Sequence, residues 1–127
     1  MAWLSTGHVV LAHHSISAIY DGSARVDLDG VVKAFRLVNP HPWVEMTVSD
    51  GAGRTRTWKL EMDNLWELTA VGVTADTLQP GDRIVVTGSP ARDRSSSLYV
   101  RQLDRPADGF RYEQVGNSPR VRPGRAK

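Results

Sequence analysis

The sequence predicts an all-β domain, a five-stranded OB-like Greek-key barrel with one short helix between the third and fourth strands. Three observations predict it: short alternating or β-branched segments recur along the 127 residues, turn signals separate them, and one helix signal follows the third segment. This order is that of the OB fold. A β-sandwich would need about seven strands, whereas the sequence predicts five.

The first predicted strand covers residues 26–38 and has Gly30 near its middle. A glycine inside a strand usually marks a bulge or a sharp bend. A long first strand with a central bend can pair in both halves of a small closed barrel. Pro40 and Pro42 then end the strand, because proline donates no ladder hydrogen bond.

The second and third predicted strands, residues 43–49 and 55–62, alternate between apolar and polar side chains. Residues 50–53 between them begin with Asp-Gly, which favours a tight hairpin turn. The two strands are therefore predicted to pair antiparallel. Trp58 falls on the apolar face of its strand, which predicts that it packs in the core.

A short helix follows the third strand. Asn64 can cap it, and Glu67 three residues later completes a capping box. Leu68 belongs to its single apolar side, which predicts a plug over one end of the barrel. Gly72 is the predicted stop.

Residues 83–88 and 98–103 supply the last two predicted strands, and a Pro-Gly turn precedes the first of them. Residues 89–97 are predicted to form a polar loop. After Arg105 the apolar residues show no clear helical or strand periodicity. We therefore place the barrel domain over residues 13–110.

Residues 111–127 are predicted to form a basic disordered tail. The chain has 16 basic and 14 acidic residues, a net charge of +2. Four of the basic residues, and no acid, lie in the last eleven positions, which leaves 12 basic against 14 acidic residues in the body. Pro119 and Pro123 argue against regular structure here. An anionic partner is the alternative interpretation of this tail.

Residues 1–12 are predicted to be a signal-peptide remnant or a disordered N-terminal segment. An apolar run ends in the small Ala12, with Val10 three positions before the predicted cleavage. The basic start of a signal peptide is missing, so a short docking strand or helix is the alternative. The signal-peptide interpretation leads us to expect a periplasmic or secreted protein. We expect no transmembrane segment, because no apolar run is long enough to span a bilayer.

Histidines are the candidate metal ligands. His13 and His14 are adjacent at the predicted mature N-terminus, and His41 lies in a proline-flanked turn. Cleavage after Ala12 would give His13 a free α-amine beside its imidazole, and such nitrogen ligands suit copper or another divalent metal. The alternative is that the histidines are structural or solvated, since adjacent side chains of an extended segment point to opposite sides.

Trp43 is the candidate ligand-binding aromatic residue. We expect its ring to form one wall of the site whose metal ligands are the histidine imidazoles. Together with the other aromatic residues it could also form the stacking platform by which OB domains bind single-stranded nucleic acid. Acidic residues dilute the basic residues of this region, and the body is slightly acidic. Nucleic acid is therefore the alternative partner and not the expected one.

No catalytic motif stands out, so we do not expect an enzyme. The chain has no cysteine, which removes disulfides and thiolate chemistry. No serine lies in a nucleophile elbow, and no glycine loop resembles a phosphate cradle. Asp27 and Asp29 share one strand face, where carboxylates usually meet solvent.

Several short motifs in combination resemble a family of small uncharacterised bacterial exported proteins. The motifs are Ala12-His13-His14-Ser15, Gly30-x-Val32, Asn39-Pro40-His41-x-Trp43, Trp58-x-Leu60-Glu61 and Gly72-x-Thr74 with Leu78-x-Pro80-Gly81-Asp82. The chain departs from that family at Ile16, where phenylalanine is frequent. The resemblance covers about residues 12–104 and implies export and a small barrel, without an assigned reaction.

These observations predict an exported small binding module. Its ligand is a metal, a small molecule or an exported protein partner, and a role as accessory subunit of an exported enzyme complex is a further alternative. A cytoplasmic single-stranded nucleic-acid-binding domain is the competing hypothesis.

Overall fold

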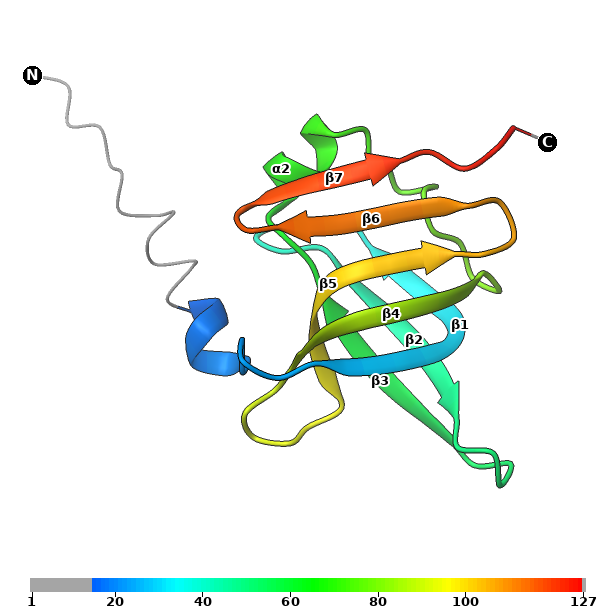
Figure 1. Ribbon diagram of the computed structural model, residues 1–127. Helices are drawn as coiled ribbons and strands as arrows, with labels where there is room; N and C mark the ends of the chain where they lie inside the picture. Colours follow the sequence, from blue (N-terminus) through cyan, green and yellow to red (C-terminus); the bar gives the residue numbers. More distant parts are fainter. Residues whose placement is uncertain (1–14, 127) are drawn as a thin grey trace, which may run out of the picture.

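Five strands close into a barrel in the computed structural model, which describes residues 15–126 (Figure 1). The elements are β1 (Val26–Arg36), β2 (Trp43–Ser49), β3 (Thr55–Glu61), α2 (Leu65–Ala70), β4 (Arg83–Pro90), β5 (Ser97–Arg105), β6 (Phe110–Val115) and β7 (Ser118–Arg122). The order β3-β2-β1-β4-β5 is antiparallel throughout, and a parallel pairing of β3 with β5 closes the ring. The predicted OB-like barrel, with its helix between the third and fourth strands, is confirmed.

β1 serves both halves of the barrel, as its length predicts. Its first half pairs with β4 and its second half with β2. The register shift lies between Val32 and Ala34, so the bulge is not at Gly30. Gly30 instead allows a close approach of two backbones, because a Cβ there would stand 2.3 Å from the carbonyl oxygen of Thr47.

The β2–β3 hairpin and the helix cap also form as predicted. Trp43 to Ser49 pair residue by residue with Glu61 to Thr55. Asn64 caps α2, because its side-chain oxygen accepts the amide of Glu67 at 2.8 Å. The capping box is incomplete, however: the amide of Asn64 donates to its neighbour Asp63 at 2.7 Å and not to Glu67.

One apolar core fills the barrel, and the second apolar cluster lies outside it. Core residues come from every strand of the barrel and from Leu68 of α2, which is fully buried. The second cluster joins Tyr20, Ala91 and Tyr99, so the segment before β1 packs on the outer side of β5. A helical turn over residues 15–19 precedes Tyr20.

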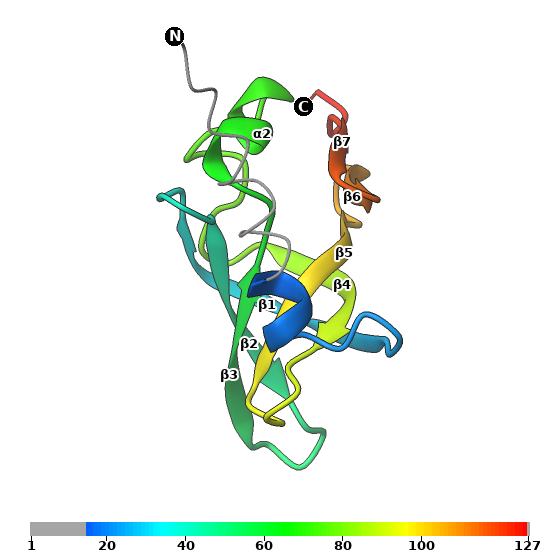
Figure 2. The ribbon, with the colours of Figure 1, turned by 90° about the vertical axis from the view of Figure 1, so that its left-hand side faces the viewer.

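The predicted disordered tail over residues 111–127 is wrong, because β6 and β7 form an antiparallel hairpin there. The hairpin extends the sheet beyond β5, and Figure 2 shows it facing α2 across one end of the molecule. Pro119 and Val121 point inward, whereas Arg120 and Arg122 point outward, so the basic residues occupy one face of a strand. Pro119 is tolerated because β7 is an edge strand.

Buried polar contacts fix the hairpin to the barrel. Gln114 donates from Nε2 to Oδ2 of Asp63 at 2.7 Å and accepts the hydroxyl of Tyr112 at 2.5 Å. Asp63 and Gln114 are each less than 10% exposed. The chain just before α2 is thereby joined to β6, 51 positions later.

Candidate functional site

The outer face of β2 and β3 carries the predicted ligand-binding residue. Strand alternation turns Val44 and Met46 into the core and leaves Trp43 on the outer side, opposite Glu61. The ammonium of Lys59 lies 4.9 Å from the centre of the Trp43 ring, a cation–π contact that fixes the indole against the strand.

His41 is held in the turn before β2, and its ring orientation is defined. Backbone hydrogen bonds from Met62 to the carbonyl of Pro42 and from Leu65 to the carbonyl of Pro40 fasten this turn to the start of α2. The His41 Nδ1 lies 2.6 Å from the carbonyl oxygen of Met62. A carbonyl only accepts, so Nδ1 carries the hydrogen. The neutral ring then has its lone pair on Nε2.

Glu61 links this turn to the segment before β1. One carboxylate oxygen of Glu61 accepts the hydroxyl of Tyr20 at 3.0 Å, and the other lies 3.9 Å from Nδ1 of His41. Tyr20 is buried, and burial together with the charge of Glu61 raises the pKa of its phenol. The chain that follows the first fourteen residues is therefore anchored beside the His41 turn.

A shallow hollow of about 210 Å³ brings the two predicted residues together. It is lined by Val38, Asn39, Pro40, His41, Trp43, Lys59 and Glu61. His13 and His14 lie outside the described residues. Within residues 15–126, no three histidine, aspartate or glutamate side chains cluster so as to hold a metal ion. The metal site therefore stays a prediction that depends on the N-terminal histidines.

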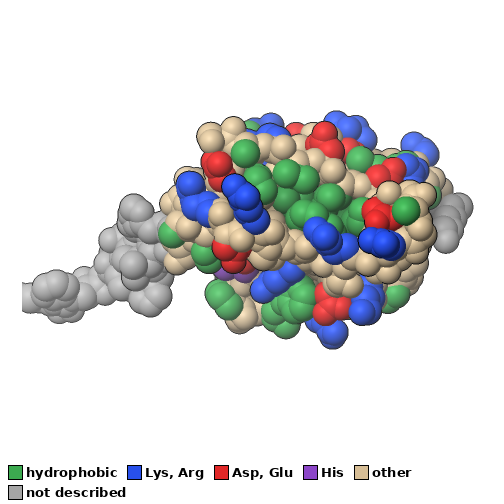
Figure 3. Space-filling view, turned by 90° about the horizontal axis from the view of Figure 1, so that it is seen from below, with side chains coloured by type: hydrophobic (Ala, Val, Ile, Leu, Met, Phe, Trp, Pro, Cys, Tyr) green, Lys and Arg blue, Asp and Glu red, His purple; other side chains and the backbone are tan. Residues whose placement is uncertain are grey.

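The same face is a poor match to a nucleic-acid platform. Glu45 pairs across the strands with Lys59 and lies 3.9 Å from Arg36, and Glu61 lies opposite Trp43. Carboxylates thus alternate with the cations beside the aromatic ring. On the face in Figure 3, acidic side chains likewise lie among the basic ones. Phosphate backbones require a continuous basic track.

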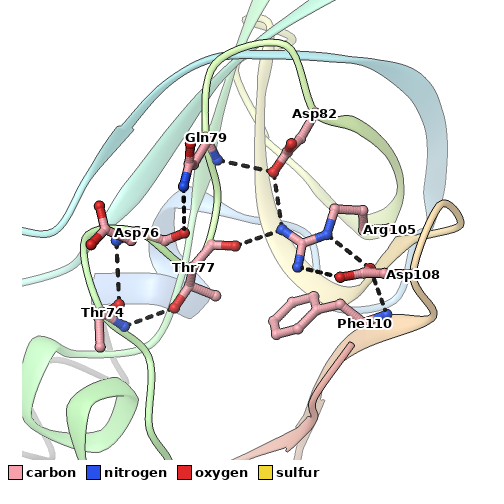
Figure 4. Close-up of polar contacts among 8 residues, drawn as sticks. All are labelled: Thr74, Asp76, Thr77, Gln79, Asp82, Arg105, Asp108 and Phe110. Atoms are coloured by element: carbon pink, nitrogen blue, oxygen red, sulfur yellow. Dashed lines mark hydrogen bonds and ion pairs between the residues drawn. The ribbon is translucent and has the colours of Figure 1, made fainter. Parts of the chain in front are cut away.

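Another hollow, of about 520 Å³, lies between the segment before β4 and the β5–β6 turn, and an arginine clamp crosses it (Figure 4). Arg105 donates to Asp108 at 2.9 Å, to Asp82 at 3.0 Å and to the carbonyl oxygen of Thr77 at 2.6 Å. Its hydrogen bonds lower the pKa of Asp108. The clamp thus joins the segment before β4 to the β5–β6 turn, and these contacts occupy the Arg105 guanidinium.

Sequence reasoning missed a group of residues on the outer side of β5. Tyr99 and Arg101 point away from the core there, and the Tyr20 ring packs against Tyr99 with centroids 5.9 Å apart. Arg101 and Arg25 both donate to the hydroxyl of Ser89, at 3.1 and 3.3 Å. The only sequence signal is the alternation of Tyr99 and Arg101 with apolar residues.

A family model described as a family of unknown function, DUF6152, matches residues 2–99. The chain belongs to this family. The match includes the His41 turn and ends within β5, so the last two strands of this DUF6152 protein lie beyond it. No curated protein is significantly similar in sequence. Among the described residues, no helix of the DUF6152 chain has the length and apolar character needed to cross a membrane.

Proposed function

We propose that this chain is an exported, non-enzymatic binding module that holds copper or another divalent metal through His41 and the N-terminal histidines His13 and His14. The oriented imidazole of His41 carries the proposal. Metal-binding histidines commonly donate one ring N–H to a backbone carbonyl, which fixes the tautomer and presents the other nitrogen to the metal. The contact of Nδ1 with Met62 has this form.

The position of Tyr20 supports the participation of the N-terminal histidines. Tyr20 follows His14 by six positions, and its hydroxyl binds the same Glu61 carboxylate that lies beside His41. The proposal places His13 and His14, which precede this anchored segment in the sequence, beside the His41 ring.

Trp43 serves as a wall of this site. The indole lines the same hollow as His41, and Lys59 holds it against the strand. A large apolar ring beside a metal limits the access of water to one side.

Titration calorimetry with Cu(II) and Zn(II) tests the metal proposal. We expect one metal per chain for the form that begins at His13. His41→Asn should weaken binding at least about tenfold, because the amide can still donate to the Met62 carbonyl but no imidazole remains. Asp76→Asn, a change to an exposed carboxylate away from this turn, is the matched control.

Two outcomes would contradict the metal proposal. One is the absence of binding heat for either ion, and the other is an equal affinity of the wild type and His41→Asn. Circular dichroism of each variant shows whether the barrel remains intact.

Export is tested separately, by cell fractionation followed by N-terminal sequencing. The proposal predicts a periplasmic or secreted protein that begins at His13. A cytosolic protein that keeps Met1 or Ala2 would remove both the export and the α-amine ligand. Binding of that cytosolic form to a single-stranded oligonucleotide at low salt would then favour the nucleic-acid alternative.

A further inference from the structure

The second hollow of interest lies on the outer side of β5 and has a volume of about 410 Å³. The helical turn before β1, β5 and the β6–β7 turn form its walls. It is lined by Ile16, Ser17, Tyr20, Gly22, Tyr99, Arg101, Gly116 and Asn117. None of these residues lines the His41 hollow, and the volume is that of a small-molecule pocket.

Arg101 brings a positive charge into this hollow. Its guanidinium stacks on the Tyr99 ring at 4.8 Å and donates from Nε to the hydroxyl of Ser89. Within residues 15–126, no carboxylate forms an ion pair with Arg101, whereas Arg83, Arg105 and Arg111 each contact an aspartate at 3.0 Å or less. Stacking uses the face of the guanidinium and leaves its terminal N–H groups at the edge.

Arg25 adds a second charge to the same place. Its Nη1 donates to the Ser89 hydroxyl and to the carbonyl oxygens of Gly22 and Ala24, both at 2.8 Å. Burial lowers the pKa of Arg101, and the charge of Arg25 acts in the same direction. Both guanidinium groups nevertheless stay charged at neutral pH.

Like charges that converge on one hydroxyl repel each other, and partial burial weakens the solvation of Arg101. A bound anion would offset the repulsion between the two guanidinium groups and would also compensate for the weaker solvation of Arg101. The fork of N–H groups on a guanidinium matches the two oxygens of a carboxylate or phosphate.

The aromatic wall indicates what accompanies the anion. The buried rings of Tyr20 and Tyr99 line the hollow and lie at an interplanar angle of 39° to each other, and Ile16 packs against them. We propose that this hollow binds a small organic oxyanion, a carboxylate or phosphate monoester whose charge meets Arg101 and whose ring or apolar body lies against Tyr20 and Tyr99.

Ligand-observed and protein-observed NMR with the full chain tests this site. The probes are phenyl phosphate and benzoate, with inorganic phosphate and neutral benzamide as comparisons, all in the presence of EDTA. The chelator separates this test from the metal proposal. We expect phenyl phosphate or benzoate to shift the amide signals of Arg101 and Asn117, and to bind at least fivefold more tightly than benzamide.

Arg101→Gln should weaken binding of phenyl phosphate at least tenfold, and Arg101→Lys should recover only part of it, because a lysine lacks the fork. Arg56→Gln, a change to an exposed arginine on β3, should leave the affinity unchanged. The site would be disproved if no probe bound below 10 mM, or if Arg101→Gln bound as the wild type does. Equal weakening by Arg101→Gln and Arg56→Gln would also overturn it, since it would indicate general charge attraction.

Discussion

At the scale of single residues, close backbone contacts set the shape of the barrel. A Cβ on Gly88 would stand 2.5 Å from the carbonyl oxygen of Tyr99, on the neighbouring strand. The register between β4 and β5 shifts between Thr87 and Gly88, so the glycine lies at an irregularity of the sheet. This approach places the outer-face residues Tyr99 and Ser89 beside each other.

Gly88→Ala should therefore destabilise the protein by about 1–3 kcal/mol, because the added methyl group meets a backbone atom that cannot rotate away. Urea unfolding followed by circular dichroism measures the loss. Gly22→Ala is the control, since a Cβ there meets nothing within 4 Å. A change of less than about 0.5 kcal/mol for Gly88→Ala would contradict the close approach.

The residues of the His41 hollow could be predicted in part. His41 and Trp43 are two positions apart in one turn, so their proximity follows from the sequence. The contact between Arg25 and Ser89 joins residues 64 positions apart. Contacts of that separation depend on how the barrel closes and on the segment that packs outside it, and no local pattern encodes them.

At the scale of elements, the barrel strands were predictable because one face of each is buried, which produces alternation and turn signals. The β6–β7 hairpin was not predicted because the alternation of its side chains was not recognised in a segment rich in basic residues and proline. Phe110, Tyr112 and Gln114 are buried, and Arg111 and Glu113 alternate with them. The Gly116-Asn117 turn between the strands is itself a hairpin signal, with a φ of 58° at Gly116.

Gln114→Met should destabilise the hairpin, because it leaves the buried Asp63 carboxylate without its Nε2 partner. We expect a loss of about 1–3 kcal/mol in the free energy of unfolding. Hydrogen exchange should show the β6 and β7 amides opening more readily than those of β1 to β3.

Arg120→Gln, on the outward side of β7, is the control and should change the stability by less than about 0.5 kcal/mol. Equal exchange rates in wild type and Gln114→Met would show that Asp63 and Gln114 do not hold the hairpin to the barrel.

At the scale of the whole molecule, the three tyrosines report on how the outer segments pack. Tyr20 precedes β1, Tyr99 lies in β5 and Tyr112 in β6, and all three are buried. Burial raises the pKa of each phenol above its usual value of 10.0. The folded protein therefore favours the neutral phenol more strongly than the unfolded chain does.

The native protein should therefore show no tyrosinate absorbance near pH 10, whereas the urea-unfolded chain should titrate there normally. Because the folded pKa values are raised, this stabilisation is complete below pH 10 and is lost as the pH rises further. The free energy of unfolding should fall above pH 10. A native tyrosine that ionises at its usual pH would contradict the packing of the segment to which it belongs.

The most direct test of the account is ¹⁵N NMR of the histidine rings in the form that begins at His13. Without metal, we predict that Nδ1 of His41 carries the proton and that Nε2 does not. Addition of Zn(II) should shift the Nε2 resonance of His41 together with those of His13 or His14. A proton on Nε2, or a His41 signal that does not change when the metal binds, would contradict the proposed role of this turn.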